Sequence, residues 1–193
     1  PRAASALGAL AGNGVGVMID ETDGFTPNPV VSHAILAYKR DRKTGLADGS
    51  VGTPAHNPPE DGGFKYNPPN GGPADSEIKT WIQNKANEFL AEGLKPVRRI
   101  PFAKAKSAPT THRHNYMAEY IDDLGAVVDF DAIRSARLTL GVDPLGGPGG
   151  LYWGRIADRY KISLTVESEV VDATFRFMTF GWVGQIRMEC SSR

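Results

Sequence analysis

The segment from Thr53 to Asn70 gathers the side chains with the clearest chemical potential in the chain. It holds a histidine, His56, and a lysine, Lys65, in a stretch rich in proline and glycine. An imidazole can exchange a proton near neutral pH, and an ammonium group can hold an anion. On residue type alone, His56 is also consistent with a loop histidine bonded to the backbone, and Lys65 with an ordinary surface lysine.

Other polar residues of this segment have simpler interpretations. Glu60 and Asp61 could form an acid/base pair, but adjacent acids in a glycine-rich loop are more often solvated. Asn57-Pro58 and Asn70-Gly71 are typical of turns, because asparagine and proline favour turn geometry and glycine adopts positive φ freely. Residue types therefore indicate a site here without fixing its chemistry.

Three other patterns do not indicate a site. The glycines from Gly147 onward lack the dinucleotide-binding spacing, which requires glycine where Tyr152 stands, and the phosphate-binding P-loop pattern is absent. His112 and His114 have no further ligand at metal-binding spacing, so we expect an exposed basic loop there. The single cysteine, Cys190, excludes an internal disulfide framework.

The elements that must position the segment follow from apolar periodicity and from stop signals. Helices are expected over residues 3–11, 29–38, 76–92, 115–124, 131–137 and 151–160. Strands are expected over residues 15–19, 49–52, 138–142 and 162–166. Their alternation predicts an α/β fold with a mixed, largely parallel sheet flanked by helices.

The strand at 49–52 should lead directly into the segment, although Ser50 and Gly52 stand where apolar residues would be expected. Proline and glycine then predict a long loop over residues 57–74. Asp75 should cap an amphipathic helix, and residues 101–114 are expected to be basic and irregular.

Composition excludes several classes of partner. Lys plus Arg equals Asp plus Glu at 22 each, so no net charge draws the chain to nucleic acid or to an anionic membrane. No apolar run approaches the roughly 20 residues that span a bilayer. Low cysteine content and the lack of a secretory pattern favour a cytoplasmic location. We expect neither nucleic-acid nor membrane partners.

Five separated blocks of the chain resemble the α-D-phosphohexomutase family, most closely its bacterial phosphoglucomutase branch, and occur in that family's order. These blocks are Gly24–Pro27, Leu46–Gly49, Thr53–Asp75, Asp143–Gly147 and Arg187–Ser192. In the family, the loop of the third block reads Thr-(Ala/Pro)-Ser-His-Asn-Pro, and its serine carries a phosphoryl group.

The resemblance assigns roles residue by residue. Ala55 stands at the phosphoserine position, and a methyl group cannot hold phosphate. The resemblance implies catalytic positions at Ala55, His56 and Lys65, and substrate-binding positions at Thr53, Asn57 and Lys65. It also implies Mg²⁺ bound by the phosphoserine oxygen and by carboxylates from outside this chain, so no metal ligand is expected within it.

The implied reaction converts glucose 1-phosphate to glucose 6-phosphate through a phosphoserine, with glucose 1,6-bisphosphate as primer. Covalent catalysis of this kind divides one difficult transfer into two easier ones. The resemblance further implies a piece of a larger polypeptide, with residues 1–128 forming the later part of a first domain and 129–193 the start of a second, similar domain. With Ala55 the chain is expected to bind hexose phosphates but to be inactive; the alternative is a non-catalytic module that binds a sugar phosphate or a protein.

Overall fold

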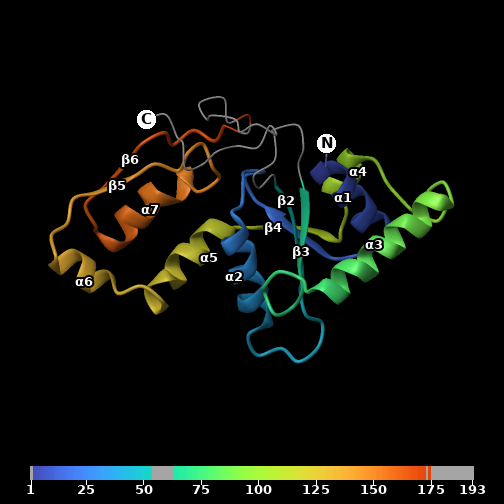
Figure 1. Ribbon diagram of the computed structural model, residues 1–193, viewed down its shortest axis with the longest axis horizontal. Helices are drawn as coiled ribbons and strands as arrows, with labels where there is room; N and C mark the ends of the chain where they lie inside the picture. The colour runs from blue at the N-terminus through green and yellow to red at the C-terminus, as the bar shows by residue number, and fades with distance from the viewer. Residues whose placement is uncertain (1, 54–62, 173, 175–193) are drawn as a thin grey trace.

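The computed structural model describes residues 2–53, 63–172 and 174 (Figure 1). Its helices are α1 (Arg2–Gly12), α2 (Asn28–Lys39), α3 (Ser76–Ala91), α4 (Phe102–Lys106), α5 (Tyr116–Asp123), α6 (Phe130–Ser135) and α7 (Gly150–Tyr160), with a 3₁₀ turn at Leu124–Ala126. Its strands are β1 (Val17–Asp20), β2 (Gly49–Thr53), β3 (Gly63–Asn67), β4 (Thr111–His114), β5 (Leu140–Val142) and β6 (Leu164–Val166).

Within the described residues the strands pair two by two, and helices lie beside them (Figure 1). β1 and β4 run parallel, as do β5 and β6, whereas β2 and β3 are antiparallel. The parallel pairs join strands that helices separate in the sequence, as such connections require. The predicted mixed α/β class is therefore confirmed.

Two predictions of irregular structure were wrong. Residues 63–67, expected within a long loop, form β3 and pair with β2. The segment 101–114 contains α4 and β4, so His112 and His114 belong to a strand rather than to an exposed loop. The sequence of β4 has no apolar alternation that would predict a strand. The strand is held in place by main-chain pairing with the distant β1 and by an ion pair between Arg113 and Asp23 (2.7 Å).

The unexpected residues in β2 are explained by strand alternation. Gly49 and Val51 are buried, while Ser50 and Gly52 lie on the exposed face. The buried face lies against α2, since a Cβ built on Gly49 would stand 2.6 Å from Val31 Cγ1 and 2.9 Å from Ile35 Cδ1. Glycine at position 49 thus lets the strand approach the helix closely.

Replacing Gly49 tests this close approach. Gly49→Ala should lower the free energy of unfolding by about 1–3 kcal/mol, the usual cost of overpacking a core. Gly52→Ala is the matched control in the same strand, because its Cβ would meet no heavy atom within 4 Å. Urea denaturation of both variants provides the measurement, and equal midpoints would contradict the packing argument.

Helix α3 begins as predicted but packs differently. The Asp75 carboxylate accepts a hydrogen bond from the Ile78 amide at 2.9 Å, which confirms the cap. However, no α3 side chain is buried within the described part of the chain, and Trp81 and Leu90 are 64% and 61% exposed. An amphipathic pattern identifies an apolar face, but it does not identify what covers that face.

The main apolar cluster joins elements that are distant in sequence. It contains Val30 of α2, Ile121 of α5, Phe130 of α6, and Tyr152 and Ile156 of α7. The cluster includes residues on both sides of the predicted boundary between 128 and 129, which remains a prediction. No helix among the described residues is both long and apolar enough to span a membrane.

Candidate functional site

The β2–β3 hairpin carries the predicted site. Thr53, the last residue of β2, pairs with Gly63, the first residue of β3. The two described residues that flank positions 54–62 are thus neighbours in the hairpin. Ala55, His56 and Asn57 fall in that segment, outside the described residues, and so does the predicted convergence of His56 with Lys65.

Lys65 lies in the middle of β3, directly opposite Val51 of β2. Cross-strand partners and residues two apart share a face, so Lys65, Val51 and Asn67 are on the same side of the hairpin. The Lys65 side chain is exposed, and it forms no ion pair with any residue in 2–53, 63–172 or 174. Its ammonium group can therefore meet an anion near the end of the hairpin where Thr53 pairs with Gly63.

The two residues after Lys65 are anchored on opposite faces of β3. The Tyr66 hydroxyl donates to Asp48 Oδ2 at 2.8 Å. Burial, and then this bond to Asp48, raise the pKa of Tyr66 to about 12. Asn67 is buried, and its Nδ2 donates to Ser32 Oγ at 3.0 Å and to the Gly71 carbonyl at 3.2 Å.

Sequence reasoning missed Tyr66 and Asn67 because it assigned them to a loop. The available signal was the alternation of polar and aromatic residues over 64–67, which is typical of a strand. Neighbouring prolines and glycines concealed that signal.

The turn after β1 is fixed by charged groups. Asp20 Oδ1 accepts hydrogen bonds from the Thr22 amide (2.9 Å) and the Gly24 amide (3.1 Å). Asp23 is paired with Lys106 (2.6 Å) and with Arg113. Lys106, and then Arg113, hold the pKa of Asp23 below its usual value. The turn leads into α2, so these contacts help to position the helix that supports the hairpin.

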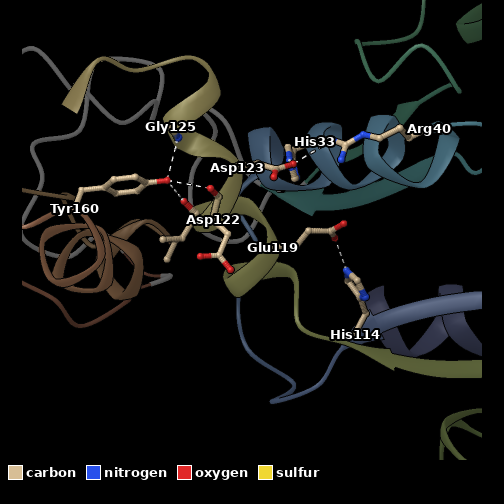
Figure 2. Close-up of polar contacts among 9 residues, drawn as sticks. His33, Arg40, His114, Glu119, Asp122, Asp123, Gly125 and Tyr160 are labelled. Carbon is tan, nitrogen blue, oxygen red and sulfur yellow. Dashed lines mark hydrogen bonds and ion pairs between the residues drawn. The ribbon is translucent and has the colours of Figure 1, made fainter. Parts of the chain in front are cut away.

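Helix α5 is fastened to its neighbours by two histidine–carboxylate contacts (Figure 2). His33 of α2 lies 3.0 Å from Asp123, which also accepts from Arg40 at 3.1 Å. His114 of β4 lies 2.8 Å from Glu119. The last residue of α5 is thus tied to α2, and its middle is tied to β4.

Tyr160 ties α7 to the same helix (Figure 2). Its hydroxyl donates to the Ile121 carbonyl at 2.6 Å and accepts from the Gly125 amide at 2.9 Å. Its ring stacks on Phe130 with centroids 3.7 Å apart. These contacts fix the C-terminal end of α5 against α7, so we interpret Tyr160 as a structural residue.

The Asp123 contacts predict a pH dependence. His33, and then Arg40, hold the pKa of Asp123 below its usual value. The carboxylate therefore stabilises the fold above the unfolded-state pKa of about 3.9, and this contribution is lost as the pH falls through the lower folded-state value. The difference in Tm between the native chain and Asp123→Asn should be present at neutral pH and vanish on acidification. A difference independent of pH would contradict this assignment.

Within the described residues, no group of three or more His, Cys, Asp or Glu side chains comes together to hold a metal.

Comparisons with known proteins agree on one family. The model of the phosphoglucomutase/phosphomannomutase α/β/α domain I matches residues 2–91. A phosphoglucomutase of Komagataeibacter xylinus is 56% identical over 192 residues, covering 100% of this chain and 35% of that protein. A phosphoglucomutase of Schizosaccharomyces pombe is 32% identical over 132 residues, covering 65% of this chain and 23% of that protein.

A solved structure of a phosphomannomutase-type protein from Thermus thermophilus has the same fold, with a TM-score of 0.62 and 22% identity. The match covers 88% of this chain and 34% of that one. The chain thus spans about a third or less of the proteins it matches. The 56% identity over the whole chain and the match to domain I over residues 2–91 show that this chain belongs to the phosphoglucomutase/phosphomannomutase family.

Proposed function

We propose that this chain carries the phosphoryl-transfer loop of a phosphoglucomutase-type enzyme, in a form that binds hexose phosphate without transferring phosphate. The parent reaction interconverts glucose 1-phosphate and glucose 6-phosphate. The observation that carries the proposal is the β2–β3 hairpin, in which Thr53 pairs with Gly63 and Lys65 is exposed two residues further along β3. Ala55 stands where the family resemblance puts the phosphoserine.

The hairpin supports a defined division of roles. Lys65 supplies a positive charge to the phosphoryl oxygens, where charge develops during transfer. Thr53 and Asn57 bracket the phosphoserine position, and His56 follows it directly. A serine hydroxyl would form the new O–P bond while the sugar oxygen leaves. Alanine has no oxygen to form that bond, so the chemistry stops at binding.

Two small molecules belong to this proposal. Glucose 1,6-bisphosphate is the primer that would phosphorylate a serine at position 55. Mg²⁺ would neutralise charge on the phosphoryl oxygens, with carboxylate ligands from outside this chain.

The second candidate is a non-catalytic module that binds a sugar phosphate or a protein. Ala55 favours it, because a chain without the nucleophile can retain a binding role. The balanced charge of the chain argues against nucleic acid and anionic membranes as partners in either case. Cytoplasmic location remains part of the proposal, since sugar phosphates are metabolites of that compartment.

Ligand binding tests the proposed site. We expect glucose 1,6-bisphosphate to bind saturably, and Lys65→Ala to weaken binding about tenfold, the effect of losing one hydrogen bond to a charged group. Lys79→Ala, at an exposed lysine of α3, is the control and should bind like the native chain. Calorimetric titration provides the measurement. Absence of saturable binding, or equal affinities in the two variants, would count against the site.

A further inference from the structure

We propose that Asn67 is a positioning residue, which fixes the face and register of β3 so that Lys65 meets the phosphate of the ligand. This inference rests on the proposed function and assigns a role to a residue that no earlier argument placed in the site. Asn67 is 1% exposed and is the only buried polar or charged residue in the part of the chain that the structure describes. A buried amide must be hydrogen-bonded or it destabilises the fold.

The Asn67 side chain connects three segments of the chain. It lies at the end of β3 opposite Gly49 of β2. Its Nδ2 donates to Ser32 Oγ of α2 and to the carbonyl of Gly71 in the following turn. One side chain thus ties the hairpin to the helix beneath it and to the turn that leaves it.

The surrounding geometry leaves little freedom at this junction. Gly71 has φ +78°, and a Cβ there would stand 2.9 Å from Leu36 Cγ and 3.1 Å from the Ser32 carbonyl oxygen. Gly49 approaches α2 equally closely. Both backbone segments around Asn67 therefore pack directly on α2, so its two hydrogen bonds are made in a fixed frame.

Strand periodicity links the orientation of Lys65 to that of Asn67. Lys65 is two residues before Asn67 and shares its face. A slip of one residue in β3 would move Lys65 to the opposite face of the hairpin. By pairing with Ser32 and Gly71, Asn67 opposes such a slip. Lys65 then emerges on the α2 side of the hairpin, in register with Val51.

The test combines a ligand-independent readout with a binding readout. In Asn67→Ala, exchange of the Lys65 amide with solvent should accelerate about tenfold or more, because the ladder near it opens more often. The cross-strand contact between Val51 and Lys65 should also weaken in nuclear Overhauser spectra. Ser32→Ala removes only one of the two partners and provides a milder variant if Asn67→Ala does not fold.

The binding readout is a double-mutant cycle with glucose 1,6-bisphosphate as probe. Asn67→Ala and Lys65→Ala should each weaken binding about tenfold, and the double variant should lose no more than either alone, because coupled residues are not additive. A purely structural residue would instead add its loss to that of Lys65. Fully additive losses would overturn the positioning role.

Asn13→Ala is the matched control. The Asn13 Nδ2 also donates to two main-chain oxygens, those of Ala9 (2.8 Å) and Arg98 (3.3 Å), but it follows α1 rather than β3. It should change neither Lys65 exchange nor affinity. If neither the native chain nor any variant binds the bisphosphate, but Asn67→Ala still accelerates exchange of the Lys65 amide, the positioning role of Asn67 is supported and the proposed function fails. If binding occurs and Asn67→Ala changes neither readout, positioning fails alone.

Discussion

Glucose 1-phosphate should not be converted to glucose 6-phosphate by this chain. Ala55 lacks the oxygen on which the phosphoryl group would reside, and removing a catalytic nucleophile typically costs on the order of 10⁶ in rate. The change acts on the transfer step itself, so the expected rate is that of the uncatalysed background.

A coupled assay for glucose 6-phosphate, run with Mg²⁺ and glucose 1,6-bisphosphate, measures this directly. The Komagataeibacter xylinus relative provides the active control that its name implies. Lys65→Ala provides the internal control, since residual activity from a contaminating mutase would be unchanged by it. Turnover that co-purifies with the chain and falls in Lys65→Ala would show that transfer proceeds without a hydroxyl at position 55.

Restoring the hydroxyl should have a large effect only in a longer protein. Ala55→Ser in this chain should take up no stable phosphate from glucose 1,6-bisphosphate. The same substitution in a chimera, where residues 1–193 replace the matched 35% of the Komagataeibacter xylinus protein, should be phosphorylated to near completion. The longer protein would supply metal ligands and phosphate contacts from its other parts. These contacts must hold the bisphosphate donor in line with the serine oxygen for transfer to occur.

Intact mass distinguishes the four proteins, which are the chain and the chimera, each with and without the Ala55→Ser substitution. Only the chimera with Ala55→Ser should gain one phosphate, and chelation of Mg²⁺ should abolish that gain. Efficient Mg²⁺-dependent labelling of the short chain with Ala55→Ser would show that this segment holds a complete transfer site. An unlabelled chimera that folds would instead count against position 55 as the phosphoserine position.

Local patterns predicted most elements of the fold. The cap at Asp75, the helix of α7 and the strand at β6 follow from residue types within a few positions of each other. The helix expected over residues 29–38 is α2, and it has proline in its first turn. Such features depend on backbone preferences and capping, which act locally.

The failures of prediction concern contacts between distant residues. β4, with the sequence Thr-His-Arg-His, is a strand because β1 lies beside it, and no local preference reveals that partner. β3 was hidden by the prolines and glycines around it, although its pairing with β2 determines where Lys65 stands. The family roles of Lys65 came from resemblance, whereas the buried amide of Asn67 could be found only from its burial and its partners.

The apolar cluster between α2 and α7 has a consequence for how the chain is made. Val30 leaves the ribosome long before Tyr152 and Ile156, yet it packs in one cluster with them through Ile121 of α5. Contacts between residues so distant in sequence form slowly, because a long loop must close first. The side of α2 that carries Val30 therefore stays uncovered during synthesis until α5 and α7 have emerged. Chaperones that bind exposed apolar segments would have access to this side of α2 during that interval.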